Sequence, residues 1–294
     1  MAYRIKRLEK EGVILHYRTS FRITVLGHSL ARFHYSLQLI SPEIKQEIID
    51  YFVQSKCTQY VLETEGCYDL EVGAFTDLNS SDEYFLAFYD ETQRKYRQYF
   101  DEQIGAEFNK IENLGCGFLL EENGVKTPPV AYNPKVAVKI DDLDIKIMRM
   151  LAENARIPTI EIAKALNVTV ITIKNRIKRL INANIITGFF ITVDGLKVGY
   201  RSFYVQINLK DYNMKNKIIE YVKKNPNLIG IIHTIGYNND LDFCYVLNDV
   251  TKLHEIIKDL SAKFPDSIKN FKYYSLLKGH KWIGIPQYDL KIRR

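Results

Sequence analysis

A repeated segment constrains the fold of this chain more than any other feature of its sequence. The five residues at positions 4–8 recur unchanged at positions 176–180, and similar residues follow at the same separation. The matches are Arg4-Ile5-Lys6-Arg7-Leu8 with Arg176-Ile177-Lys178-Arg179-Leu180, Val13-Ile14 with Ile185-Ile186, and Gly27 with Gly199. Because self-similarity at a fixed separation marks a repeated structural unit, we expect two copies of one module.

Three short amphipathic runs follow one another within residues 141–200, which is typical of a helix-turn-helix. The first begins at Asp141, a favourable N-cap, and the second at Pro158, since proline suits the first turn of a helix. Asn167 is the expected left-handed turn residue before a third helix capped by Thr169. The apolar face of this third helix consists of Val170, Ile173, Ile177 and Leu180.

The opposite face of the third helix concentrates positive charge. Residues 169–184 include four basic residues and no acidic one. A helix laid against phosphates needs such a face, and a helix-turn-helix places its last helix in the major groove, so a merely solvated charged face is the weaker alternative. We expect Ile171 and Asn175 at base edges and the four basic residues at phosphates. The predicted DNA-binding residues are Thr169, Ile171, Thr172, Lys174, Asn175, Arg176, Lys178 and Arg179.

Residues 141–200 resemble the winged helix-turn-helix of the Lrp/AsnC regulators. The resemblance rests on the acidic start of the first helix, on Arg156, on residues 176–180 and on the strand-forming wing that follows. Ile171 departs from the pattern, because the family usually has polar residues early in this helix. The resemblance implies a prokaryotic, sequence-specific DNA-binding transcriptional regulator.

The first copy begins in the middle of its third helix. Ile5 and Leu8 would lack the packing partners that two preceding helices supply. We therefore expect an N-terminally truncated form or a mis-started reading frame, with natural loss of the first reader as the alternative. Since such a chain has one working reader, a palindromic operator requires a homo-oligomer.

Each copy then shows the order βαββαβ, which predicts an α+β fold with two ferredoxin-like sandwich domains, similar to the RAM-type domains of the Lrp/AsnC family. The elements expected in the first copy are strands at 32–39, 58–65, 69–75 and 111–120, with helices from Pro42 and from Ser80 or Ser81. Those expected in the second are strands at 202–209, 228–234, 241–247 and 268–277, with helices at 214–224 and 251–264. The predicted domains are a reader and wing remnant (1–26), a first sandwich (27–121), a proline-containing linker (122–140), the winged helix-turn-helix (141–200) and a second sandwich (201–294).

The central hairpins of the two sandwiches carry a glycine and an aspartate. Both residue types form tight turns, which is the simpler interpretation. In the family, a glycine and an acidic residue here border a cleft for small effectors such as amino acids, so the resemblance implies an effector site between paired sheets. The predicted effector-binding residues are Gly66, Tyr68, Asp69, Gly236 and Asp240.

Composition and residue spacing argue against several other classes. No apolar run is long enough to span a bilayer, and the N-terminus lacks a signal-peptide pattern, so a cytoplasmic protein is expected. Cys57, Cys67, Cys116 and Cys244 lack metal-ligand spacing, so we expect no metal site. The six histidines are scattered, so we expect no catalytic residues, no enzyme activity and no cofactor.

Two alternatives remain open. Siroheme decarboxylases are built on a similar repeated architecture, and His233 lies near the corresponding strand. However, residues 233–237 lack the basic and aromatic run expected around a haem. A ligand-sensing or structural assembly protein without DNA binding is the other alternative.

Overall fold

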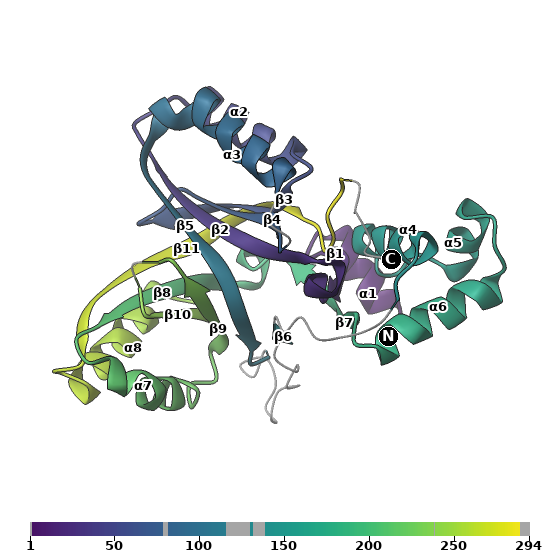
Figure 1. The fold of residues 1–294 in the computed structure, drawn as a ribbon. Helices are drawn as coiled ribbons and strands as arrows, with labels where there is room; N and C mark the ends of the chain where they lie inside the picture. Colours follow the sequence, from purple (N-terminus) through teal and green to yellow (C-terminus); the bar gives the residue numbers. More distant parts are fainter. Residues whose placement is uncertain (1, 79–81, 116–129, 132–138, 238, 289–294) are drawn as a thin grey trace.

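The elements of the fold follow the predicted order twice (Figure 1). The computed structural model describes residues 2–78, 82–115, 130–131, 139–237 and 239–288. The elements of the first copy are α1 (Ala2–Lys10), β1 (Ile14–Phe21), β2 (His28–Leu37), α2 (Pro42–Gln54), β3 (Thr58–Gly66), β4 (Leu70–Asp77), α3 (Glu83–Tyr96) and β5 (Phe100–Asn113). After β6 (Val130–Ala131) come α4 (Asp142–Glu153), α5 (Thr159–Ala165), α6 (Val170–Asn182), β7 (Ile186–Val193), β8 (Arg201–Leu209), α7 (Lys215–Val222), β9 (Leu228–Ile235), β10 (Leu241–Leu247), α8 (Val250–Lys263) and β11 (Ile268–Trp282).

The two sandwiches form one closed ring of strands. The strand order is β2-β4-β3-β11-β8-β10-β9-β5, and pairing between β2 and β5 closes it; β6 adds to the free part of β5. The two longest strands, β5 and β11, join the halves, because each pairs first with its own half and then with the other. The expected pairing of the two sheets therefore occurs within one chain. The inner faces of the two sheets contact each other inside the ring, through bonds such as those from Arg32 to Asp242 and from Tyr274 to Glu71.

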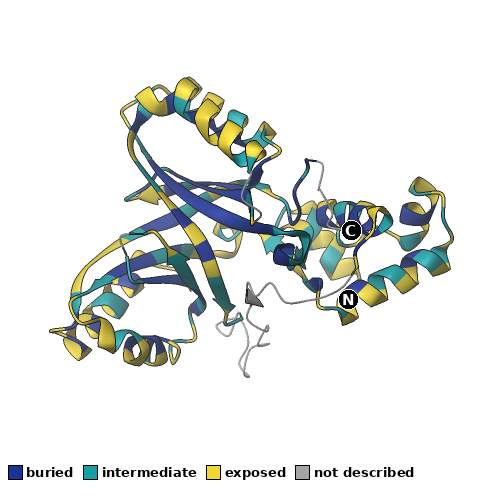
Figure 2. Ribbon diagram, viewed as in Figure 1, coloured by how far each residue is buried: buried dark blue, intermediate teal, exposed yellow. Residues whose placement is uncertain are grey.

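Helices cover the outside of this ring. α2 and α3 lie over the first half and α7 and α8 over the second, with their outer surfaces exposed (Figures 1 and 2). α2 begins where the sequence predicts, because Ser41 accepts a hydrogen bond from the Ile44 amide at 3.4 Å and Pro42 occupies the first turn. Its buried side chains, Ile48, Ile49 and Phe52, pack on the sheet.

The last strand of the first copy lies earlier than predicted. We expected residues 111–120, whereas β5 begins at Phe100, directly after the short turn that ends α3. Gly105 pairs with Phe33 of β2, and a Cβ there would lie 2.8 Å from the Phe33 ring, so the close packing requires glycine at this position. Ser80, Ser81, Cys116, residues 116–120 and most of the predicted linker lie outside the described residues. The helix predicted from Ser80 or Ser81 begins at Glu83 with Asp82 as its N-cap.

The inside of the ring contains a buried ionic cluster. Arg32 of β2 is fully buried and donates from Nε to Glu71 Oε1 at 2.7 Å and from Nη1 to Asp242 Oδ2 at 2.6 Å. Glu71 belongs to the first half and Asp242 to the second. The Tyr60 and Tyr274 hydroxyls also donate to Glu71, at 2.9 and 2.8 Å. This cluster therefore links the two halves through polar contacts in a region that water does not reach.

The ionic cluster holds one permanent cation and two carboxylates. Burial raises the pKa of Asp242 to about 6, and its Oδ1 has no hydrogen-bond partner among the described residues. His34 lies beside Arg32 and Glu71, and burial together with the nearby guanidinium lowers its pKa to about 4. The histidine is therefore neutral near pH 7 and does not supply a second positive charge.

Candidate nucleic-acid interface

The winged helix-turn-helix of α4, α5, α6 and β7 forms as the sequence predicts. Asp141 and Asp144 make a capping box at the start of α4, and the Thr169 hydroxyl accepts from the Thr172 amide at 3.1 Å at the start of α6. Asn167 has φ 54°, the left-handed conformation expected of the turn. Ile173 and Leu180 are fully buried against the other helices, so the packing fixes which side of α6 faces outward.

The outward side of α6 carries most of the predicted DNA-binding residues. Ile171 is 71% exposed, and Lys174, Asn175 and Lys178 are also exposed. Thr169 and Thr172 lie at the exposed N-terminal end of the helix, with Thr172 half-buried. Figure 1 shows α6 at the edge of the molecule, away from the ring of strands. This arrangement leaves the face free to contact a groove.

Arg176 and Arg179 form ion pairs within the helix-turn-helix. Arg176 Nη1 donates to Asp144 Oδ1 at 3.1 Å and also contacts Asp141, while Arg179 donates to Asp144. Asp144 is fully buried, and hydrogen bonding to Asp141 raises the pKa of Arg176. The phosphate contacts expected of the two arginines stay predictions, and within the folded chain these side chains also hold α6 against α4. The sequence pattern did not reveal this, because the acidic partners lie more than 30 residues earlier in the chain.

The first copy contributes its wing to the second copy's helix-turn-helix. β1 pairs antiparallel with β7, and the Ala155 amide donates to the Tyr17 carbonyl at 3.1 Å. Arg156 stacks on the Tyr17 ring, with Cζ 4.5 Å from its centroid, and donates to the Tyr17 hydroxyl at 2.8 Å and to Glu9 at 3.2 Å. By contrast, no residue of α1 is buried.

The predicted effector residues occupy equivalent places in the two hairpins. Asp69 Oδ2 accepts from the Leu37 amide at 2.7 Å, and Asp240 Oδ2 accepts from the Leu209 amide at the same distance. Tyr68 is buried inside the ring and donates to Gln206 Oε1 at 3.1 Å. These three side chains anchor the hairpins.

The two glycines adopt positive φ, with Gly66 at 119° and Gly236 at 98°. A Cβ at Gly66 would lie 2.8 Å from the Tyr273 carbonyl oxygen, so close backbone approach also requires glycine there.

Gly66 also borders a cleft of about 650 Å³. The cleft lies between the β3–β4 hairpin, the segment that joins β7 to β8, and the second half of the ring. Arg201 and Glu65 form an ion pair on its wall, with Nη1 2.5 Å from Oε1, and the Ser275 hydroxyl donates to the same Glu65 oxygen at 2.9 Å. Of the predicted effector residues, only Gly66 lines this cleft; Tyr68, Asp69, Gly236 and Asp240 do not.

Sequence reasoning missed the buried ionic cluster of Arg32, Glu71 and Asp242. One signal was present, because Arg32 and His34 alternate with the apolar Phe33 and Tyr35 along one strand. The alternation predicted a strand with an apolar face, and it did not show that the polar side lies inside the ring. His233, the residue singled out for the haem alternative, pairs with Glu112 at 3.1 Å on the second half.

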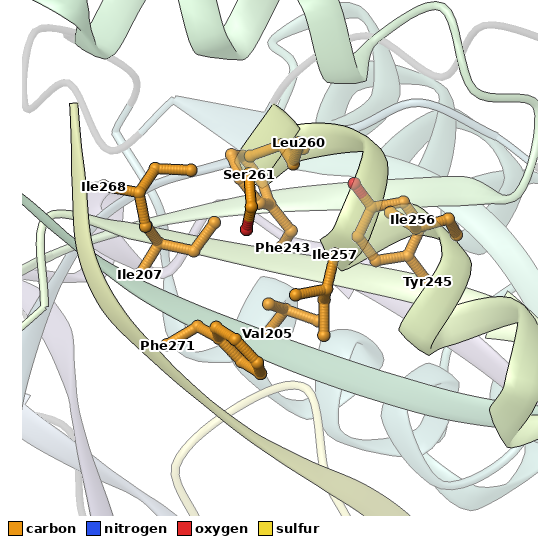
Figure 3. A pocket seen from close by; sticks show the side chains of 10 residues that line it. All are labelled: Val205, Ile207, Phe243, Tyr245, Ile256, Ile257, Leu260, Ser261, Ile268 and Phe271. Carbon is orange, nitrogen blue, oxygen red and sulfur yellow. The ribbon is translucent and has the colours of Figure 1, made fainter. Parts of the chain in front are cut away.

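A second enclosed space lies under α8 in the second half (Figure 3). Its volume is about 10 Å³, and apolar side chains from α8 and the sheet converge on it, including Val205, Phe243 and Ile257. A space of this size holds at most about one water molecule, so it is part of the core. No helix among the described residues has the length and apolar character needed to cross a membrane.

Comparisons with known proteins agree with this geometry. Residues 140–187 match the winged helix-turn-helix DNA-binding family. An uncharacterised HTH-type transcriptional regulator of Pyrococcus furiosus is 42% identical over 104 residues, which are 35% of this chain and 70% of the relative. The regulatory protein AsnC of Haemophilus influenzae is 29% identical over 119 residues, which are 40% of this chain and 79% of AsnC.

One solved structure matches nearly the whole chain. The siroheme decarboxylase NirDL has a TM-score of 0.60 and covers 97% of this chain and 82% of its own, at 10% sequence identity. At this identity the similarity concerns the fold, and it shows that two joined modules of this kind occur in another protein.

Proposed function

Because the chain belongs to the Lrp/AsnC family of HTH-type transcriptional regulators, we propose that α6 enters the major groove of duplex DNA with Ile171 and Asn175 at base edges. The chain is a sequence-specific DNA-binding transcriptional regulator. The exposed outer face of α6, held in place by Arg176 and Arg179, is the observation that supports this docking. A capped, buried helix presents its outer side chains at fixed angles, which direct readout requires.

The contacts divide into two groups. Asn175 can form paired hydrogen bonds with adenine, and the Ile171 side chain can touch a thymine methyl group. Lys174 and Lys178 are exposed, and they take the phosphate contacts that position the helix without selecting a sequence.

Fluorescence anisotropy across a salt series tests the phosphate contacts. Replacing Lys174 and Lys178 with Ala should weaken binding to all duplexes and reduce the slope of log K against log salt by about one per lost contact. Lys217→Ala, an exposed change on the distant α7, is the matched control and should leave the slope unchanged. An unchanged slope in the double variant would contradict the proposed docking.

Two chains would bind a palindromic operator, because the described residues form one complete helix-turn-helix. Light scattering of the DNA complex, combined with footprinting, measures the number of chains for each protected half-site. A single chain that protects two half-sites would contradict this proposal.

An effector fits best in the cleft beside Gly66. A ligand with both an ammonium and a carboxylate group, such as an amino acid, could bind Glu65 and Arg201 through charge-assisted hydrogen bonds. Calorimetry with a panel of amino acids tests this: Glu65→Gln should remove binding, while Asp69→Ala should lower stability because the Leu37 amide loses its acceptor. A panel without any binding ligand would contradict the effector proposal.

The likeness to NirDL supplies a separate test of the enzyme alternative. Titration with a tetrapyrrole should leave the visible absorption spectrum of the ligand unchanged if the chain acts only as a regulator. A stoichiometric spectral change would favour the decarboxylase alternative instead.

A further inference from the structure

The helices that cover the two halves of the ring carry opposite charge. The first layer consists of α2 and α3, where acidic residues outnumber basic ones. The second layer consists of α7, the two lysines that follow it, and α8, where lysines outnumber acidic residues. The two layers lie on opposite sides of the ring, with their outer surfaces exposed (Figures 1 and 2).

The charge changes sign at equivalent positions of the repeat. Glu47 of α2 and Lys217 of α7 each precede the buried pair of isoleucines in their helix. Asp90 of α3 and Lys258 of α8 each lie two residues before a buried position. The two layers therefore pack on the ring in the same way and differ in the charge of their outer sides.

Most of these charges are not neutralised within the described part of the chain. In the first layer Glu91 is the acidic residue that forms an ion pair, with Lys95, and in the second layer Lys223 is the lysine that does so. The exposed acidic residues of the first layer without an ion pair are Glu43, Glu47, Asp50, Glu83 and Asp90. The exposed lysines of the second layer without an ion pair are Lys217, Lys224, Lys252, Lys258 and Lys263. Unpaired charges of the opposite sign are fewer, namely Arg94 in the first layer and Glu255 and Asp259 in the second.

The first layer also contains an open groove of about 800 Å³ along α2 and the end of α3. Its lining includes the carboxylates of Glu43, Glu47 and Asp50. The Tyr96 hydroxyl donates to Glu47 Oε1 at 3.1 Å, which holds this carboxylate in place. Lysine side chains have long flexible stems that can reach carboxylates in such a groove.

We propose that the first layer of one chain binds the second layer of another copy of this chain, with lysines of α7 and α8 at the acidic groove of α2 and α3. Because the two layers differ and lie on opposite sides of the ring, each bound chain leaves one layer free, and further copies add head to tail. This contact differs from the two-fold pairing that a palindromic operator requires, so it stands independently of DNA recognition. Duplex DNA is the competing occupant of the second layer, but it would leave the acidic groove unexplained.

The size of the layers indicates a weak contact. α2 has 13 residues, so a surface two helices wide measures about 20 Å by 20 Å, on the order of 400 Å² for each chain. Stable complexes bury about 800 Å² for each partner. Exposed ion pairs also contribute little individually and are screened beyond about 10 Å at 0.1 M salt. Self-association therefore requires low salt and a high protein concentration.

Sedimentation velocity of the full chain without DNA tests the contact. The mean sedimentation coefficient should rise with protein concentration at about 50 mM salt and stay constant at about 0.5 M salt, where screening is stronger. Reversing charge in either layer, by Asp50→Lys with Asp90→Lys or by Lys224→Glu with Lys258→Glu, should weaken association by about tenfold or more. Lys139→Glu with Lys164→Glu, two exposed positions outside both layers, is the matched control and should leave association unchanged.

Mixing the two reversed variants separates this contact from a general effect of charge. Each variant alone has two layers of the same sign and should not associate with itself. Together they should associate again, because each reversed layer meets a layer of the opposite sign on the other variant. Loss of association in both variants without recovery in the mixture would overturn the proposal.

A wild-type sedimentation coefficient that does not change with protein concentration at low salt would also overturn the proposal. Weaker DNA binding by the variant with Lys224→Glu and Lys258→Glu would then identify duplex DNA as the occupant of the second layer.

Discussion

The two copies of the module carry the same five residues in different surroundings. In α6, Arg176 and Arg179 bind Asp144, and Leu180 is fully buried. In α1, the identical segment has neither the carboxylate nor the apolar cover. An identical sequence therefore forms a fixed reader in one copy and a peripheral helix in the other, because its partners come from elements outside the segment.

The two halves of the ring differ in the opposite way, because equivalent positions hold different chemistry. Arg32 and His34 on β2 correspond to Tyr204 and Gln206 on β8, while the acidic residues Glu71 and Asp242 correspond across the hairpins. The single guanidinium serves both carboxylates, so the halves are not interchangeable. The following experiments test these contrasts, beginning with the largest expected effect.

Replacing Arg32 with Met should destabilise the protein most. The change leaves Glu71 and Asp242 as uncompensated buried carboxylates, and removing one member of a buried ion pair typically costs about 3–5 kcal/mol. Urea denaturation measures the change. The triple variant Arg32→Met, Glu71→Gln, Asp242→Asn should recover much of the loss, because no charge is then buried. A single variant as stable as the parent would show that the ionic cluster does not link the halves.

Asp242→Asn should make stability less sensitive to pH. The folded pKa of about 6 lies above the ordinary value of 3.8, so the folded chain holds the proton more tightly than the unfolded chain. This residue therefore favours the folded state below about pH 4, and its contribution is lost as pH rises to about 6. The resulting decrease in the free energy of unfolding is on the order of 2–3 kcal/mol.

Asparagine resembles the protonated side chain, so the variant should exceed the parent in stability at pH 8 and equal it near pH 3. The difference between the two denaturation curves is the relevant quantity, because His34 titrates in the same range with the opposite sign in both proteins. Glu71, Arg32 and Gln206 also face Asp242 and remain unchanged. A constant difference across this pH range would contradict the raised pKa.

Asn175→Ala should reduce discrimination between operator and mismatched DNA by about 1–2 kcal/mol, because an adenine contact is lost. Its counterpart in the first copy is Tyr3, which is 80% exposed on α1. Tyr3→Ala should leave this specificity ratio unchanged in anisotropy competition assays. Equal effects of the two changes would show that α1 reads bases as well.

The smallest expected effect is the difference in stability loss between Arg179→Ala and Arg7→Ala. Arg179 is partly exposed but binds a buried carboxylate, so we expect Arg179→Ala to lower the free energy of unfolding by about 1 kcal/mol. Arg7 pairs with Glu11 in solvent, where such pairs contribute about 0–0.5 kcal/mol. Thermal unfolding of both variants measures this difference. Equal shifts of Tm would show that the two arginines contribute equally to stability.

The sequence alone determined the local elements of this protein. The N-caps Asp141 and Thr169, the left-handed Asn167 and the exposed face of α6 were all predicted correctly, because each depends on residues within one or two helical turns. The repeat also predicted two βαββαβ units. The DNA-contact roles of the α6 side chains stay predictions.

Only the tertiary structure decided the partners of those elements. Strand alternation shows that β2 has a polar side, but it cannot show that Asp242, 210 residues later, meets Arg32 there. The pairing of Arg179 with Asp144, the early start of β5 at Phe100 and the exposure of Phe189 likewise depend on contacts between distant segments. Local propensity and periodicity act over a few residues, whereas the closed ring fixes which faces meet, and burial then sets the charge state of what lies between them.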